Sequence, residues 1–214
     1  MEQLKIICLP LGAMRTNCYL VFDPATREGC VIDPGGETPE QGSDKILARL
    51  DTECIRLKFI LLTHAHFDHM LSLSCLREAT GAPLAIYQYD ADALADPNLT
   101  YMAQFAGIRT PEKPAEQLLS HGDRLMLGAH TLEVLHTPGH TAGSVTLKGD
   151  GFLITGDTLF RGSVGRCDLF GGDEMALLQS LKQLRELDGD YKIFAGHGST
   201  TTLSRERECN VYMR

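Results

Sequence analysis

Apolar residues alternate with polar ones, or run in short blocks, and Gly, Pro, Asn or Asp ends most of these blocks. This pattern predicts β-strands, because successive strand side chains face opposite sides and turn residues close each strand. The block at 55–63 is largely apolar, which is typical of a strand buried on both faces. The predicted strands form two groups, at 5–11, 17–23, 29–36, 55–63 and 82–90 and at 124–128, 130–138, 143–150, 151–157 and 191–198.

Helical spacing of apolar residues separates or follows these strands. A predicted helix at 42–51 would begin near Ser43 or Asp44, whose side chains can cap a helix N-terminus. A second predicted helix, at 69–81, closes at a glycine. The clearest helix lies at 171–190, where leucines recur at helical spacing.

The order of these elements indicates how the sheets are arranged. Strands followed by helices in both halves fit two sheets that pack on each other, with helices on their outer faces. No change in composition marks a boundary, so we expect one domain over residues 1–214. We interpret residues 98–121 as a partly helical excursion, and expect its apolar stripe to pack in the core rather than to act as a lid: Tyr101, Met102, Phe105 and Ile108.

Composition and charge narrow the class of protein. The hydrophobic fraction of 43% and the charged fraction of 22% are typical of a folded globular chain. A net charge of -8, without a run of Lys and Arg, argues against nucleic acid as a partner. We expect no membrane segment, since no run approaches the roughly 20 apolar residues of a spanning helix. We also expect no signal peptide, since MEQLKIICLPLGAM has no basic stretch followed by a sustained apolar one. The seven scattered cysteines form no CxxC pair, so we expect reduced thiols and a cytoplasmic protein.

Potential metal ligands gather where the strand at 55–63 ends. The stretch THAHFDHM places His64, His66, Asp68 and His69 within six positions. Alternate residues of an extended segment face the same side, so His64 and His66 can reach one ion together. The chain then turns into a helix, whose first turn carries Asp68 and His69. Imidazole and carboxylate ligands together suit zinc, iron or manganese better than calcium or magnesium.

Three further candidates follow apolar strands and stand beside glycines. His140 lies in HTPGHTAGS, Asp157 in LITGDTLF and His197 in IFAGHGS. Glycine lets the backbone bend sharply or approach a ligand closely, and strand-end loops hold binding residues on a rigid scaffold. We expect these residues to converge on the first cluster as a metal site. The remaining histidines are interpreted as turn, surface and strand residues: His121, His130 and His136.

The ordered motifs THAHFDH, TPGHTAGS, TGDTLF and AGHG resemble those of the metallo-β-lactamase-fold hydrolases, and VIDPGG resembles the early strand-Asp-Gly element of that family. The resemblance implies an α/β protein with a four-layer αββα sandwich. It also implies two divalent metal ions, which we expect to be zinc, with iron and manganese as alternatives. Carried over by position, the ligands would be His64, His66 and His140 for one ion, Asp68, His69 and His197 for the other, and Asp157 as a bridge, with Asp33 supporting a ligand by a hydrogen bond.

Within that superfamily, TLFRGSVGRCDLFGGD and the ending HGSTTTLSRERECNVYM are similar to short glyoxalase II-like hydroxyacylglutathione hydrolases. The implied reaction is hydrolysis of S-lactoylglutathione to lactate and glutathione, in which a metal-bridging hydroxide attacks the thioester. Asp68 and Asp157 would act first as ligands, and could also steer the hydroxide or pass a proton. Glyoxalase II enzymes hold glutathione with basic residues of a helical C-terminal domain, a grip that we expect to be missing here. Arg161 and Arg166 would anchor a substrate carboxylate instead, or else brace their glycine-rich loop.

Three alternatives stay open at this point. Persulfide dioxygenases share the histidine motifs but resemble a site with a single iron. Hydrolysis of a lactone, a β-lactam or another ester would use the same chemistry as the thioester reaction. A non-enzymatic metal-binding module is the third alternative, although structural zinc sites are closed and typically have four Cys and His ligands. The mixture of histidine and aspartate, without paired cysteines, favours an open and reactive site.

Overall fold

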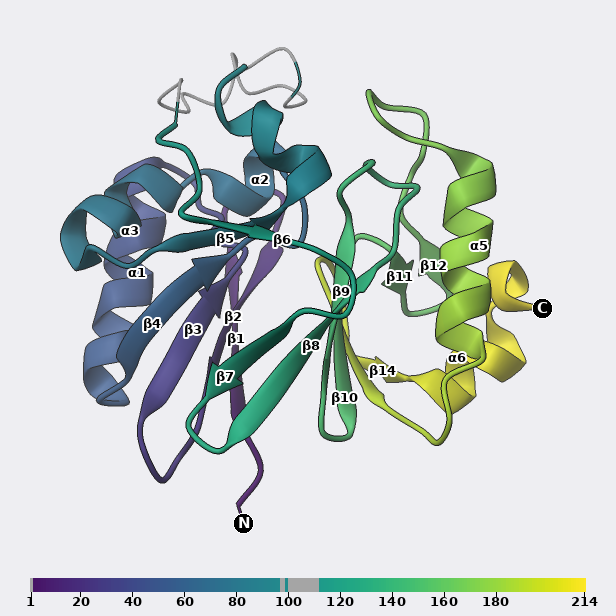
Figure 1. Ribbon diagram of the computed structural model, residues 1–214, viewed down its shortest axis with the longest axis horizontal. Helices are drawn as coiled ribbons and strands as arrows, with labels where there is room; N and C mark the ends of the chain where they lie inside the picture. Colours follow the sequence, from purple (N-terminus) through teal and green to yellow (C-terminus); the bar gives the residue numbers. More distant parts are fainter. Residues whose placement is uncertain (1, 97–98, 100–111) are drawn as a thin grey trace.

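Two six-stranded sheets pack face to face in a computed structural model of the chain, which describes residues 2–96, 99 and 112–214 (Figure 1). Helices cover the outer face of each sheet, so the molecule has four layers in the order αββα. The predicted fold class is therefore confirmed. Most of the excursion predicted at 98–121, including its apolar stripe, lies outside the described residues.

The first sheet has the strand order β1-β2-β3-β4-β5-β6. Its first three strands pair antiparallel, and the pairs from β3 to β6 are parallel. Parallel strands end at the same edge of a sheet, so the loops after β3, β4 and β5 lie together. The bounds of these strands are Lys5–Leu11 (β1), Thr16–Phe22 (β2), Glu28–Ile32 (β3), Arg56–Leu61 (β4), Leu84–Tyr87 (β5) and Gln117–Leu119 (β6).

The second sheet has the order β14-β13-β10-β9-β8-β7, in which only the pair β10 and β13 is parallel. The loops that follow β10 and β13 therefore leave the sheet at one edge. Its strands are Arg124–Leu127 (β7), His130–His136 (β8), Val145–Gly149 (β9), Phe152–Gly156 (β10), Lys192–Ala195 (β13) and Thr201–Thr202 (β14), and a separate hairpin consists of Leu159–Phe160 (β11) and Ser163–Val164 (β12).

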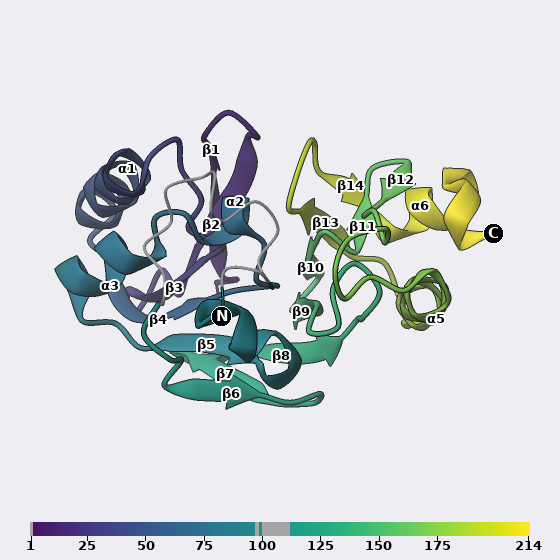
Figure 2. The same cartoon turned by 90° about the horizontal axis from the view of Figure 1, so that it is seen from above.

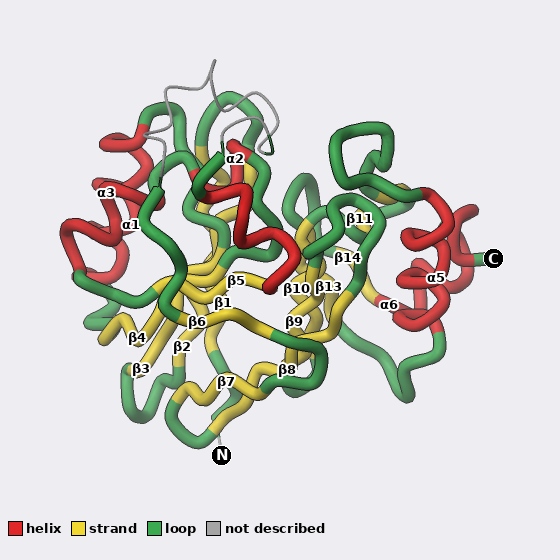
Figure 3. The backbone as a smooth tube through the Cα atoms, turned by 45° about the horizontal axis from the view of Figure 1, so that its top comes forward, coloured by secondary structure: helices red, strands yellow, loops and turns green. Residues whose placement is uncertain are grey.

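Helices α1 and α3 lie beside the first sheet, and α5 and α6 lie beside the second (Figure 2). In Figure 3 the helices flank the strands on both sides. The helical elements are Pro39–Thr52 (α1), Phe67–Met70 (α2), Leu73–Thr80 (α3), Glu174–Arg185 (α5) and Leu203–Cys209 (α6), with 3₁₀ turns at Gln88–Leu94 (η1) and Val211–Met213 (η2).

Both faces of the central strands are buried, which explains their largely apolar sequences. On β2, Leu20 and Phe22 pack in the same cluster as Ile46 of helix α1. The alternate residues Tyr19 and Val21 face the second sheet and pack in the layer between the sheets. A third apolar cluster joins the second sheet to α5 and α6. Burial on this scale is the main stabilising contribution to a fold of this kind.

The start of the first helix differs from the prediction. Helix α1 begins at Pro39, and the hydroxyl of Thr38 accepts a hydrogen bond of 3.3 Å from the backbone N–H of Gln41. The cap predicted at Ser43 or Asp44 is therefore wrong. Proline has a fixed φ that suits the first turn of a helix, and its missing N–H is not needed there.

The single helix predicted at 69–81 is divided into α2 and α3. Ser72, at the break, donates from its backbone N–H to Pro34 O at 2.9 Å and from its hydroxyl to Gly35 O at 2.8 Å. These bonds tie the chain to the loop after β3 and interrupt the helix. Gly81 ends α3 in the left-handed conformation, as its position in the sequence predicted.

In the part of the chain that the structure describes, no helix combines the length and apolar character needed to cross a bilayer.

A buried carboxylate on helix α6 links this helix to strand β14 and to the turn between β11 and β12. Glu206 accepts hydrogen bonds from the Gly162 N–H at 2.7 Å, Asn210 Nδ2 at 3.0 Å, the Thr201 hydroxyl at 2.6 Å and Arg205 Nη1 at 3.0 Å. Burial raises the pKa of Glu206, but the bonds from Thr201, Gly162 and the others outweigh burial, and the pKa is lowered. The ionised form therefore stabilises the folded chain.

We expect Glu206→Gln to lower the free energy of unfolding by about 2 kcal/mol near neutral pH, because buried donors lose a charged acceptor. A lowered folded-state pKa contributes stability above the ordinary value of 4.5 and loses it as pH falls through the folded value. Urea unfolding of the unmodified chain and of Glu206→Gln between about pH 7 and about pH 4 measures this. The difference between their free energies of unfolding should become smaller as the pH falls. A difference that stays constant over this range contradicts the assignment.

Candidate metal centre

The candidate ligands lie where strand ends from the two sheets meet. The loop after β4 contributes His64 and His66, the loops after β10 and β13 contribute Asp157 and His197, and the turn between β8 and β9 contributes His140. Backbone hydrogen bonds join the two edges, from Asn17 N to Gly196 O at 2.7 Å and from Val145 N to Thr63 O at 2.9 Å. The parallel pairing in each sheet thus sets the position of the cluster.

All seven predicted metal ligands lie in one cluster. Their ligand atoms form three overlapping groups, and within each group the atoms lie within 4.8 Å of one another. The Nε2 atoms of His64 and His140 are 3.2 Å apart, and those of His69 and His197 are 3.4 Å apart. The groups are His64, His66 and His140; His64, His69 and Asp157; and Asp68, His69 and His197.

Asp157 lies between the two ends of this cluster. Its Oδ2 atom is 3.5 Å from Nε2 of both His140 and His197, and its Oδ1 atom is 3.4 Å from Nε2 of His69. The backbone approaches it closely, since a Cβ at Gly196 would collide with Asp157 Oδ1 and with His69. This central position is the one that a bridging ligand needs.

Backbone carbonyls orient two of the histidines. Nδ1 of His140 donates to Arg166 O at 2.6 Å, and Nδ1 of His197 donates to Met14 O at 3.2 Å. A carbonyl can only accept, so Nδ1 carries the proton in both rings. In the neutral imidazole, Nε2 then faces the cluster with its lone pair, as metal ligation requires.

Asp33 orients the histidines of the first sheet. Its Oδ2 atom accepts from His69 Nδ1 at 2.9 Å and from the Thr63 hydroxyl at 2.7 Å, while Oδ1 accepts from the Thr63 N–H at 2.7 Å. The Thr63 oxygen lies 3.1 Å from Nδ1 of His64 and can accept from it, because its own proton points to Asp33. Asp33 thus forms a hydrogen bond with the candidate ligand His69, and its support of a bound metal stays a prediction.

Burial keeps one end of the cluster neutral. The pKa of His66 is lowered to about 3 by burial and by the neighbouring rings of His140 and His69. Burial also lowers the pKa values of His64 and His140. Neutral imidazole is the form that binds a metal, so this end of the cluster can bind metal near neutral pH.

The other end of the cluster is short of positive charge. Burial raises the pKa values of Asp68 and Asp157, but the positive charge of His69 outweighs it and both pKa values are lowered. Conversely, burial lowers the pKa values of His69 and His197, and the two carboxylates outweigh it and raise them. A proton on an imidazole occupies the role that a cation would otherwise fill beside these carboxylates.

One buried oxygen makes no hydrogen bond of good geometry, although His69 Nε2 lies 3.4 Å from it. Across residues 2–96, 99 and 112–214, Asp157 Oδ1 is the buried side-chain oxygen or nitrogen without a hydrogen-bond partner. An unsatisfied buried oxygen costs free energy, which a bound cation would offset. Histidine and aspartate are donors that zinc, iron and manganese accept. The residues of the cluster therefore fit divalent metal ions.

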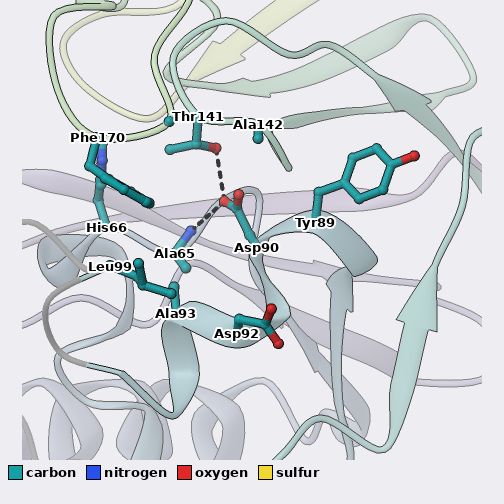
Figure 4. Close-up of a pocket in the computed structure, with 11 residues that line it drawn as sticks. Ala65, His66, Tyr89, Asp90, Asp92, Ala93, Leu99, Thr141, Ala142 and Phe170 are labelled. Carbon is teal, nitrogen blue, oxygen red and sulfur yellow. Dashed lines mark hydrogen bonds between the residues drawn. The ribbon is translucent and has the colours of Figure 1, made fainter.

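A pocket of about 220 Å³ opens beside His66 (Figure 4). The side chains of Tyr89 and Phe170, which are 63% and 66% exposed, lie on either side of Asp90 in that view. Apolar side chains form much of its remaining wall: Ala65, Ala93, Leu99 and Ala142. Of the candidate ligands, His66 lines this pocket, so the pocket adjoins one end of the cluster.

The two predicted substrate arginines lie outside this pocket. Arg161 is exposed in the turn between β11 and β12. The exposed guanidinium of Arg166 donates two hydrogen bonds of 2.7 Å to Asp168, and lowers the pKa of Asp168 to about 2. Neither arginine is among the described residues that line the pocket beside His66. Their role in substrate binding stays a prediction.

The histidines that were assigned no ligand role, His121, His130 and His136, lie outside the ligand groups. His136 stacks on Tyr87, with ring centres 4.2 Å apart, and Nε2 donates to Ala142 O at 2.9 Å. Sequence reasoning missed Met14 and Thr16, whose hydroxyl donates to Asp68 Oδ2 at 2.8 Å. A carbonyl that holds a histidine has no sequence signal.

The chain belongs to the metallo-beta-lactamase superfamily, because the sequence profile of that superfamily matches residues 11–197. It is 35% identical to the probable metallo-hydrolase YqgX of Bacillus subtilis, over 96% of this chain and 95% of that protein. It is 32% identical to the hydroxyacylglutathione hydrolase GloC of Haemophilus influenzae, over 98% of both chains. TTHA1623, solved in a di-iron-bound form, superposes with a TM-score of 0.84 at 37% identity, over 96% of this chain and 99% of that one.

We expect the purified chain to bind about two divalent ions, and a chelator to lower the melting temperature by roughly 5–10 °C, since ligands that bind only the folded state stabilise it. Asp157→Asn should reduce the bound metal to about one ion or less, because an amide bridges two cations poorly. Elemental analysis and thermal unfolding measure both effects. His130→Ala, at the far end of β8, is the control and should keep the full metal content. Equal metal content in Asp157→Asn would exclude the bridge.

Proposed function

We propose that the chain is a metal-dependent hydrolase of glutathione thioesters, which converts S-lactoylglutathione and water to lactate and glutathione. The observation that carries the proposal is the convergence of seven His and Asp side chains in one cluster, of which His66 also lines an open pocket. The full-length likeness to GloC supports the choice of thioester. We place the reaction in the cytoplasm, where glutathione is the principal thiol pool.

The proposed reaction is a simple exchange at one carbon. The oxygen of water bonds to the thioester carbonyl carbon, the carbon–sulfur bond breaks, and its electron pair leaves with sulfur, which is protonated to the thiol. Two divalent ions, when bound, supply Lewis acidity and a water that is acidic enough to react near neutral pH. We propose zinc as the metal. Iron and manganese are the alternatives to be compared with it, since TTHA1623 has a di-iron-bound form.

Side chains of this protein set the protonation state of the centre. Lowered pKa values keep Asp68 and Asp157 ionised near neutral pH, so both can hold cations or accept a proton from water. We assign ligation as the first role of each. The hydroxyl of Thr16 donates to Asp68 Oδ2, and this hydrogen bond holds that oxygen in place.

The pocket beside His66 suits the acyl group of the substrate. Two of its polar groups, Asp90 and Thr141, bond to each other at 2.8 Å, and apart from His66, Tyr89 and the exposed Asp92 the remaining wall is apolar or glycine. No lysine or arginine is found among the lining residues that the structure describes. The carboxylates of glutathione would therefore lie outside this pocket, on the side of Arg161 and Arg166, where a guanidinium can hold a carboxylate.

We expect the metal-loaded chain to hydrolyse S-lactoylglutathione, and Asp157→Asn or His66→Ala to lower kcat/KM by about a thousand-fold or more. Release of free thiol, with metal content measured on the same samples, is the assay. His130→Ala should retain most of the activity. A panel of other glutathione thioesters, lactones and simple esters shows whether the thioester is preferred.

Two results would overturn this proposal. One is a fully metal-loaded chain that hydrolyses none of the panel. The other is about one iron per chain with oxygen uptake on glutathione persulfide, which would make the protein an oxidoreductase instead.

Arg166→Ala distinguishes two roles of Arg166, which are to bind a carboxylate of the substrate or to stabilise its own glycine-rich loop. The substitution leaves the Arg166 carbonyl, and with it the bond to His140, in place. If the guanidinium holds a glutathione carboxylate, KM for S-lactoylglutathione rises about ten-fold while kcat changes little, and an uncharged thioester is unaffected. Arg56→Ala, at the start of β4, is the control. An equal loss with charged and uncharged thioesters would favour the brace.

A further inference from the structure

A carboxylate outside the ligand set lies between the two loops that supply His64, His66 and His140. Asp90 belongs to η1, which follows β5, and it is only 6% exposed. Because β3, β4 and β5 run parallel, η1 leaves the sheet at the same edge as the loop that carries His64. In the chain, Asp90 is an aspartate just after a strand of the parallel part of the sheet.

Both oxygens of Asp90 are used, and each bond leads to a loop that carries ligands. Oδ2 accepts from the Ala65 N–H at 3.0 Å and from the Thr141 hydroxyl at 2.8 Å, as Figure 4 shows. Oδ1 accepts from the Gly143 N–H at 2.7 Å. Ala65 stands between His64 and His66, and Thr141 follows His140. One side chain thus links the backbone of two loops that are far apart in the sequence.

The surroundings leave little freedom at this link. A Cβ on Gly143 would lie 2.5 Å from the Asp90 carboxyl carbon, so the close approach depends on glycine at that position. Thr141 also bonds to Ser144, with 2.8 Å between their hydroxyl oxygens and 3.1 Å from the Thr141 N–H to Ser144 Oγ. Asp90 therefore holds a closed turn on one side and an extended ligand segment on the other.

We infer that Asp90 is a positioning residue, which sets the separation and orientation of His64, His66 and His140 by clamping their two loops. It is in none of the ligand groups, so it acts through the backbone of Ala65 and the turn at 141–144. Nothing in the family assignment or in the ligand motifs gives Asp90 this role. The inference rests on the proposed metal-dependent function, but it concerns metal geometry and can be tested without a substrate.

The bonding pattern makes Asp90→Asn a sharp test. The amide has nearly the same shape, but it offers one accepting oxygen instead of two. In either orientation of the amide, the N–H of Ala65 or that of Gly143 faces an NH₂ group and loses its acceptor. Thr141→Val is a milder variant, because it keeps the Asp90 carboxylate and removes the hydroxyl that donates to it, together with the bond of that hydroxyl to Ser144.

The matched control is Asp23→Asn. Asp23 is also a buried aspartate, and it accepts from the Ala25 N–H at 2.8 Å and from the Thr26 hydroxyl at 3.0 Å, in the turn between β2 and β3. Its loss removes the same kind of bonds at a site away from the ligand loops. If the role of Asp90 were purely structural, Asp90→Asn and Asp23→Asn would have the same effects.

Three measurements separate positioning from plain destabilisation. Affinity for Zn²⁺ is measured by competition with a chelator, the visible spectrum of the Co²⁺-loaded chain reports ligand geometry, and thermal unfolding of the metal-free chain reports stability. We expect Asp90→Asn to weaken Zn²⁺ binding by about 10–100-fold and to change the Co²⁺ spectrum, while Asp23→Asn lowers only the melting temperature. In the hydrolysis assay, kcat of Asp90→Asn should fall with little change in KM.

Zn²⁺ affinity and a Co²⁺ spectrum equal to those of the unmodified chain, in a folded Asp90→Asn, would overturn the inference. If Asp90→Asn does not fold, Thr141→Val decides: a several-fold weaker affinity supports the clamp, and unchanged affinity overturns it. If the unmodified chain binds metal but hydrolyses no thioester, the proposed function fails, while the affinity and spectral comparison still tests Asp90.

Discussion

The burial of Asp68 and Asp157 among histidine rings is the interaction on which the rest of the site depends. Carboxylates at the junction of two sheets are removed from water, and a buried charge requires an opposite charge nearby. The protein supplies part of that charge by raising the pKa values of His69 and His197. It still leaves Asp157 Oδ1 without a well-formed hydrogen bond. Such an arrangement is costly for a site that is merely structural, and it becomes favourable when divalent cations complete it.

The candidate ligands are held mainly by hydrogen bonds that they donate to backbone carbonyls and to a buried carboxylate. Arg166 and Met14 hold His140 and His197 through their carbonyls, whereas Asp33 holds His69 and Thr63. These contacts fix which ring nitrogen carries the proton, so the Nε2 atoms face one another before any ion binds. Preorganisation of this kind reduces the reorganisation that metal binding and catalysis would otherwise require.

Much of this could be predicted from the sequence, because burial leaves strong patterns. Strands with two buried faces are largely apolar, and the ligands follow such strands beside glycines, so both the αββα layers and the candidate cluster were expected. Other predictions were wrong because neighbouring residues form different local hydrogen bonds or caps. Pro39 and Thr38 begin helix α1 earlier than Ser43, and Ser72 bonds to the loop after β3 instead of continuing a helix. A carbonyl such as Met14 O has no side-chain signal, so only the fold reveals it.

The metal cluster and the substrate pocket have different physical requirements, and the fold separates them. Ligation needs buried, neutral or paired groups at fixed positions, which rigid strand ends provide. The pocket instead offers accessible apolar surface, which Tyr89 and Phe170 provide from η1 and from the loop before α5. Exposed side chains such as these can change without unpairing buried polar groups, so the substrate can vary while the centre stays intact. Within η1, however, Tyr89 adjoins Asp90, whose bonds reach both ligand loops. A change in the pocket wall that shifts η1 would therefore also shift the metal ligands, which limits how far the pocket can be remodelled.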